Sequence, residues 1–237
     1  QRSTGVVTLI SRSVSNPTMT ANSSSYANEI STDGEWVLFY SDATDVVNGV
    51  TDSNNTYDAF LYQRSTGEVT LLSHSSSGPT TTANDSSFPA TISADGEWVL
   101  FISGATNVVP GVYDGNMGYD VFCHQRSTGV VSLVTHSANN QNITANRGSS
   151  TGLISADSEW VLLYSEASNL VPGVTDTNGT ADVFLYQRST GAVTLISRSD
   201  GSSMMTANDE SVPSGISADG EWVLFSSRAT NVVAGIT

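Results

Sequence analysis

Three copies of one short acidic pattern, Asp-x-Asn-x-x-x-Asp, hold the side chains of this sequence that are best suited to chemistry. The copies comprise Asp52, Asn54 and Asp58; Asp114, Asn116 and Asp120; and Asp176, Asn178 and Asp182. Oxygen ligands at alternate positions of a Gly- or Asn-rich loop are what Ca²⁺ takes, about six to eight of them at roughly 2.3–2.6 Å. The pattern therefore predicts a calcium site in each copy.

A second interpretation of the same pattern is purely structural. Asp and Asn side chains start turns by bonding nearby backbone amides, and an Asp58-type residue can cap the entry to the strand that follows it. The pattern also lacks the third regular ligand and the distal bidentate Glu of an EF-hand loop. Both interpretations stay open at this stage, and calcium is the one cofactor that the sequence suggests.

A catalytic site is not predicted. The stretch from Gly148 to Gly152 matches the G-x-S-x-G pattern of a hydrolase nucleophile elbow around Ser150. That elbow needs a strand before it and a helix after it, whereas this serine lies between an Asn-rich loop and a strand. The carboxylate pair of the Asp33 and Glu35 type recurs in near-identical copies, so it lacks the asymmetry that an acid and base pair needs. We therefore expect a protein that is not an enzyme.

The elements that must position these side chains come in repeats. The stretch ISADGEWVLF, or a near copy, recurs with its tryptophan always 62 residues on, and the marker QRSTG keeps the same step. An unbroken period is typical of a single repeat array. We predict one domain, residues 1–237, with repeats 1–62, 63–124, 125–186 and a truncated 187–237. The tryptophans are Trp36, Trp98, Trp160 and Trp222.

Charge and composition exclude several classes of partner. The formal net charge is −15, with 23 acidic residues against eight basic ones, all of them Arg. This balance repels phosphate backbones and anionic lipid, so neither nucleic acid nor membrane insertion is expected. A surface rich in Ser, Thr and Asn suggests an extracellular or cell-surface protein. No charged-then-apolar leader stands at the start, so we expect any export signal to have been removed or to lie outside this sequence.

Within each repeat, turn residues divide the chain into four short strands. In the second repeat, Gly67 can adopt the positive φ of a tight hairpin between a run ending at Tyr62 and the run Val69–Leu72. A second tight turn at Asp95 and Gly96 joins the strand 88–93 to the strand beginning EWVLF, and the DVFCH strand comes after a long loop. Apolar residues occupy both faces of the later strands, which indicates sheets covered on both sides.

These motifs resemble a known family. S-A-D-G-E-W-V-L-F is similar to the S-P-D-G-x-x-I-A-F signature of TolB-type (WD-like) β-propeller blades, and D-V-F-L-Y-Q-R-S-T-G is similar to their D-I-Y-V-x-D-x-x-T-G strand and hairpin. Ala94 replaces the usual Pro. The resemblance implies an all-β, propeller-type array of four-stranded antiparallel blades, and that family serves mainly as an interaction scaffold.

The ends of the chain hold the main irregularity. In TolB-type order the sequence contains three complete blades, from about Tyr26 to Arg198, and a split fourth, with an outer strand at 6–11 and two inner strands at 212–227. Four full repeats would need 248 residues, 11 more than the 237 present. The missing ones would carry the third strand, so we expect unpaired edges that pair with adjacent repeats of a longer array or with copies of the same chain.

Two functions remain from this sequence. One is a structural or adhesive extracellular scaffold that polymerises or forms part of a longer tandem array. The other is a closed β-propeller that binds a protein or glycan ligand. The four tryptophans could form a sugar-binding surface, but their apolar strands favour packing between blades.

Overall fold

The computed structural model describes residues 2–235, and all of its regular elements are strands. Three four-stranded sheets follow one another along the chain, and a two-stranded sheet ends it. We call them the first, second and third blades and the C-terminal half-blade.

The first blade contains β1 (Ser25–Ile30), β2 (Trp36–Ser41), β3 (Asp58–Gln63) and β4 (Val69–Leu71). The second contains β5 (Ser87–Ile92), β6 (Trp98–Ser103), β7 (Asp120–Gln125) and β8 (Val130–Leu133). The third contains β11 (Ser149–Ile154), β12 (Trp160–Ser165), β13 (Asp182–Gln187) and β14 (Ala192–Leu195), and the half-blade contains β15 (Ser211–Ile216) and β16 (Val223–Ser227).

Each complete blade is an antiparallel meander in which neighbouring strands in sequence pair in space. The order is β1-β2-β3-β4 in the first blade and its equivalent in the other two. The central pair of the first blade is in continuous register from Trp36 opposite Gln63 to Ser41 opposite Asp58. Gly67 has the positive φ, 73°, that the tight turn between β3 and β4 requires. The predicted all-β blade architecture is confirmed.

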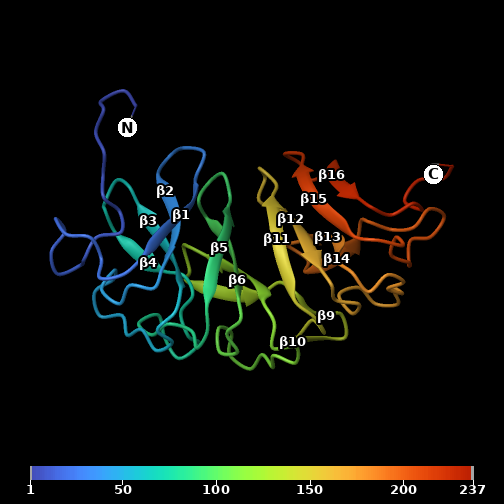
Figure 1. Cartoon of the computed structure of the whole chain (residues 1–237), viewed down its shortest axis with the longest axis horizontal. Coiled ribbons are helices and arrows are strands. Elements are labelled where there is room, and N and C mark those ends of the chain that lie inside the picture. Colours follow the sequence, from blue (N-terminus) through green and yellow to red (C-terminus); the bar gives the residue numbers. More distant parts are fainter. Residues whose placement is uncertain (1, 236–237) are drawn as a thin grey trace.

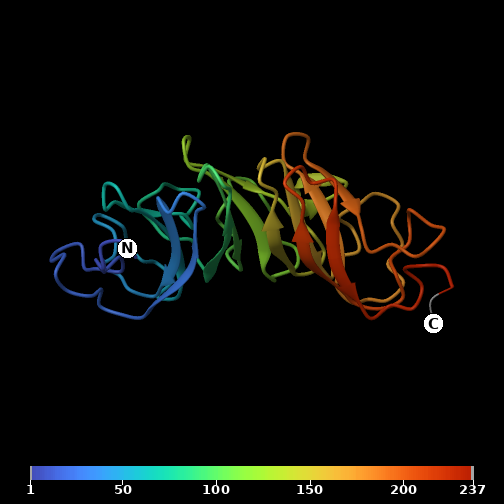
Figure 2. The same cartoon turned by 90° about the horizontal axis from the view of Figure 1, so that it is seen from above.

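The blades stand side by side along an open arc. Figure 1 shows the first blade at one end and the C-terminal half-blade at the other, with the second and third blades between them. Seen from above, the same four sheets form a row in chain order (Figure 2). The arc therefore has two outer faces, one on the first blade and one on the half-blade.

The core lies between blades, because successive residues of each strand face opposite neighbours. Leu38 of the first blade packs with Val99 and Phe101 of the second. One position later along the second blade, Leu100 packs in turn with Val161 of the third. The second blade thus buries its two apolar faces against two different blades, as the continuous apolar runs predict.

Two segments differ from the sequence prediction. Residues 6–11, expected to form an outer strand, are not in a strand, because the structure holds no strand beside them to pair with. Ile10 nevertheless packs against the core of the first blade. The segment after β8, where four strands per repeat predict no further strand, contains two short ones, β9 (His136–Ser137) and β10 (Asn140–Thr144), which pair antiparallel.

The single cysteine, Cys123, is buried. His124 is buried as well, at the place that Tyr62 holds in the first blade. Residues 2–235 contain no helix long and apolar enough to cross a membrane.

Candidate functional site

The acidic loop before β3 is closed by its own hydrogen bonds. Asp52 Oδ1 accepts the backbone N–H of Asn54 at 3.0 Å. The Asn54 side-chain nitrogen donates to Asp58 Oδ1 at 3.3 Å. The same nitrogen faces two backbone carbonyl oxygens, those of Ala83 at 2.8 Å and Asp85 at 3.2 Å. Since carbonyl oxygens only accept, the amide must present its NH₂ group to them. The corresponding bonds recur around Asn116 and Asn178.

The last carboxylate of each copy is buried. Asp58 is 2% exposed and opens β3, where Ser73 Oγ donates to its Oδ1 at 3.1 Å. Burial raises the pKa of Asp58 to about 7, although the hydrogen bonds from Ser73 and Asn54 lower it. Burial likewise raises the pKa of Asp120 and of Asp182 to about 7. These carboxyl groups take up a proton near neutral pH.

The structure brings the three predicted ligands of each copy together, but in a structural arrangement. The asparagine contributes donors to the cluster instead of a ligand oxygen, and its own oxygen accepts the backbone N–H of Thr56 in the first copy. A cation would have to displace those bonds and hold the Asp58 carboxyl in its charged form. Among residues 2–235 no group of three or more His, Cys, Asp or Glu side chains that could hold a metal ion occurs. The calcium site stays a prediction.

A second recurring constellation lies at the junctions between blades. The Trp36 indole of the first blade covers Gly96 in the turn between β5 and β6, so closely that a Cβ at this glycine would overlap the ring. Trp160 covers Gly220 of the half-blade in the same way. Both glycines have positive φ, 67° and 72°, so the turn and the packing each favour a residue without a side chain.

An arginine of the next blade covers the rings of two tryptophans, Trp36 and Trp98. The Arg126 guanidinium carbon lies 4.5 Å from the centroid of the Trp36 ring, and that of Arg188 lies 3.9 Å from the Trp98 ring. Each arginine is held in place by its own blade: Arg126 donates through Nε to the carbonyl of Gly96 at 2.9 Å and pairs with Glu97 at 3.1 Å. The Trp36 junction thus joins a tryptophan to a turn and to an arginine of the following blade, and the Trp98 and Trp160 junctions each show one of these two contacts.

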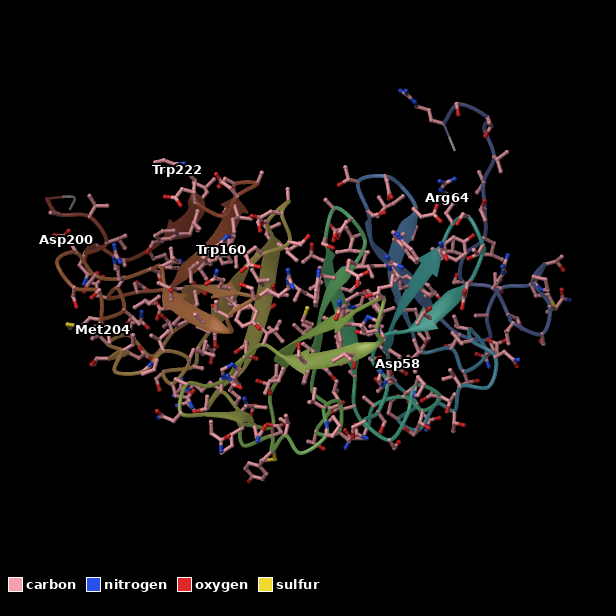
Figure 3. The ribbon with its side chains drawn as sticks, turned by 180° about the vertical axis from the view of Figure 1, so that it is seen from behind. Asp58, Arg64, Trp160, Asp200, Met204 and Trp222 are labelled. Atoms are coloured by element: carbon pink, nitrogen blue, oxygen red, sulfur yellow. The ribbon has the colours of Figure 1, made fainter. Side chains whose placement is uncertain are left out.

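The two ends of the arc carry the unmatched halves of this junction. Trp222 of the half-blade is 77% exposed, whereas the other three tryptophans are half-buried. At the opposite end, the turn residue Gly34 has only Ile30 Cδ1, at 3.9 Å, near the place of a Cβ. In Figure 3, Trp160 lies between sheets, while Trp222 and Arg64 lie at opposite ends of the arc.

A cluster of aromatic rings, which the sequence analysis missed, joins the first two blades. Tyr26 and Tyr40 stack at 5.1 Å, Tyr57 meets both edge-on, and Phe88 meets Tyr40 at 5.3 Å. The rings occupy positions that vary between repeats, so a search for recurring motifs does not find them. The ring of Tyr119 contacts that of Phe88 and extends the cluster. The side chains of Tyr26 and Tyr119 are exposed, so the cluster has an accessible surface.

The G-x-S-x-G stretch around Ser150 lies in a sheet and does not form a nucleophile elbow. Ser150 lies inside β11, opposite Tyr164 of β12, and not at a turn between a strand and a helix. The structure therefore gives this serine the surroundings of a sheet residue.

Comparison with known proteins finds similarity at the level of structure only. No family model matches the sequence, and no curated protein matches it. Similar structures include TolB from Acinetobacter baumannii, with 13% identity and a TM-score of 0.45 over 92% of this chain and 43% of that one. A putative TolB from Agrobacterium tumefaciens has 17% identity and a TM-score of 0.41 over 73% of this chain and 48% of that one. The tricorn protease has 12% identity and a TM-score of 0.46 over 85% of this chain and 15% of that one.

The chain spans less than half the length of either TolB structure. The TolB-type resemblance of the blade motifs is matched by the presence of TolB structures among the similar ones. The blade architecture itself rests on the strand order and register described above.

Proposed function

We propose that this chain is a non-enzymatic extracellular repeat protein, a structural or adhesive scaffold that builds larger assemblies by adding blades at its ends. Its recurring features serve the junctions between blades, and the chemistry-bearing side chains of its loops are engaged in the loops' own hydrogen bonds. The charge of −15 and the surface of Ser, Thr and Asn support an extracellular or cell-surface location.

The observation that carries this proposal is the unfinished face of the half-blade. Leu224 of β16 is 65% exposed, whereas its equivalents Leu38, Leu100 and Leu162 are fully buried by the blade that follows them. Beside it, β16 pairs with β15 alone. Apolar groups and an unpaired edge at one place mark a surface that binds further protein.

The size of the chain in solution tests this proposal. The single chain has a mass of 24.8 kDa. We expect sedimentation velocity over a dilution series to show species of higher mass that dissociate on dilution, and electron microscopy to show rings, rods or fibres. A compact species of one chain mass at every concentration contradicts the proposal.

A second candidate function is a binding module for a protein or glycan ligand, which the aromatic cluster favours. Tyrosine rings with an apolar body and a polar tip are suited to such contacts. Binding of soluble glycans that is lost in Tyr57→Ala and kept in Tyr113→Ala, a change at an exposed aromatic residue outside the cluster, would support it. The absence of binding to a broad glycan array, together with self-association, favours the scaffold.

A further inference from the structure

We propose that the half-blade of one copy docks on the first blade of a second copy, with Trp222 seated on Gly34 and beneath Arg64. The inference rests on the proposed scaffold function and names its partner and its contact. The interface would repeat between chains the junction that the structure shows within the chain at Trp36, which lies on Gly96 and beneath Arg126.

The donor half of this junction is complete on the half-blade. The Trp222 backbone N–H bonds Ser217 Oγ at 2.9 Å, as Trp160 bonds Ser155 Oγ at 2.9 Å, so the turn before each ring has the same geometry. Trp222 immediately precedes β16 and lies two residues before Leu224, so the two side chains face the same way, just as Trp36 and Leu38 face the second blade. The side chains that an additional blade would cover are therefore already positioned.

The acceptor half is equally complete on the first blade. Arg64 donates through Nε to the Gly34 carbonyl at 2.8 Å and pairs with Glu35 at 3.2 Å. The equivalent distances at the junction occupied by a tryptophan, around Arg126, are 2.9 and 3.1 Å. The turn and the arginine of the acceptor therefore hold this geometry without a tryptophan, so docking costs little conformational entropy there. The Arg64 side chain is 59% exposed, against 35% for Arg126, which an indole covers.

A cleft of about 620 Å³ lies at this acceptor. Most of the side chains that line it are apolar, among them Val7, Ile30, Val37 and Tyr62, and Arg64 lines it as well. Ile30 is 58% exposed, whereas Ile92, its equivalent in the second blade, is 6% exposed because the first blade covers it. Such a cleft can bind an indole ring, because its apolar side chains can bury the ring and the guanidinium can make a cation–π contact with it.

A second copy is the occupant that the structure favours. Donor and acceptor belong to the same chain but lie at opposite ends of an open arc, so a single chain cannot join them (Figure 1). Each half also matches the other in residue types, because Trp36 meets Gly96 and Arg126, which lie one repeat on from Gly34 and Arg64. A contact between two different surfaces of identical chains is heterologous, and it produces a closed ring or an open chain of copies.

Two variants test the two halves separately. Trp222→Ala removes the donor ring, and Ile30→Arg places a charge in the acceptor cleft. Both side chains are exposed in the single chain, so each variant should fold, which circular dichroism at low concentration checks. Their matched controls are Tyr113→Ala, at another exposed aromatic residue, and Val130→Arg, at a strand residue with the same 58% exposure as Ile30.

Sedimentation velocity supplies the readout. We expect each interface variant to raise the dissociation constant of self-association at least 30-fold, roughly the effect of removing a central anchor residue, and the controls to leave it unchanged. An equimolar mixture of the two variants should form pairs containing one of each, since Ile30→Arg retains its donor and Trp222→Ala its acceptor. Arg64→Ala should weaken association to a smaller degree.

The outcomes distinguish the two proposals. Self-association of the wild-type chain that persists in both variants overturns this contact but leaves the scaffold function standing. A wild-type chain that stays monomeric at every concentration overturns both. Variants that associate neither alone nor when mixed also overturn the head-to-tail contact, because the mixture retains one intact donor and one intact acceptor.

Discussion

The guanidinium of Arg188 lies over the ring of Trp98, 3.9 Å from its centroid, although the two residues belong to different blades. Arg188 also donates to the carbonyl of Ser158 at 2.7 Å and pairs with Glu159 at 3.5 Å, both within its own blade. The arginine thus connects the turn of one blade to the indole of the blade before it.

We expect Arg188→Ala to reduce the free energy of unfolding by about 1–2 kcal/mol, because it removes a partly desolvated cation–π contact and a hydrogen bond. Chemical denaturation measures the loss. Arg64→Ala is the matched control, since it removes the same bonds within a blade but no contact with a tryptophan of the single chain. It must be measured under dissociating conditions, and equal losses in the two variants would show that the ring contact adds nothing.

The turn glycine under the indole should tolerate a side chain less well than the same glycine at the open end. We expect Gly96→Val to cost at least about 2 kcal/mol more than Gly34→Val, because only at Gly96 would the new atoms overlap a tryptophan. The strain of a positive φ is common to both, at 67° and 68°, and cancels in the comparison. Ser158 occupies the equivalent turn position of the third blade and has a φ of 64°, so this turn accommodates a small side chain. Equal thermal midpoints for the two valine variants would contradict this packing argument.

The buried Asp58, Asp120 and Asp182 should make stability fall as pH rises. Burial raises the pKa of each to about 7 from the unfolded value of 3.8, so the folded state binds these protons more tightly. Their contribution is full below the unfolded pKa and is lost as pH rises to the folded pKa, with a slope of at most about 1.4 kcal/mol per pH unit for each carboxyl.

Denaturation at about pH 5 and about pH 8 measures this dependence. His124 opposes it over part of the range, because burial lowers the pKa of its imidazole to about 4, but it is one group against three. The triple Asp→Asn variant at the three buried positions should flatten the profile. Asp219→Asn is the control, since the Ser217 hydroxyl lowers the pKa of that exposed carboxyl. A profile that the triple variant does not change contradicts the assignment.

The predicted calcium sites should respond to pH in the opposite sense. A ligand that prefers the folded state raises its stability, and calcium needs the Asp58-type carboxyl in its charged form. We therefore expect calcium to raise the thermal midpoint more at about pH 8.5 than at about pH 6. Asp52→Asn with Asp114→Asn and Asp176→Asn should remove the shift. An unchanged midpoint at saturating calcium, at both pH values, would leave the acidic loops with a structural role only.

Strand order and the sheet-on-sheet core could be predicted from the sequence, because they depend on local signals. Glycines such as Gly67 mark the tight turns, and the continuous apolar run after Trp98 requires a neighbour on each face. The packing of tryptophans between blades follows from the same pattern. These features repeat in every copy, so the spacing of residues reveals them.

The contacts at the site were less predictable, because they join residues far apart in sequence or unlike their equivalents. Nothing local in the QRSTG motif indicates that Arg126 covers the ring of Trp36. Residues 6–11 have the composition of an outer strand, but a strand needs a partner. The Asp-x-Asn-x-x-x-Asp pattern predicts that Asp52, Asn54 and Asp58 lie close together. It does not predict the orientation of the Asn54 amide, which depends on a hydrogen bond to the backbone carbonyl of Ala83 in a later loop.

The half-blade is attached to the third blade by an incomplete junction. Trp160 covers Gly220, but within residues 2–235 no guanidinium lies over its ring, whereas Arg126 covers Trp36 and Arg188 covers Trp98. Under a pulling force applied across residues 2–235, β15 and β16 should therefore separate from the third blade before any complete blade opens. Docking of a neighbouring copy on Trp222 would protect β15 and β16 and make the assembled form more resistant to mechanical force than the single chain.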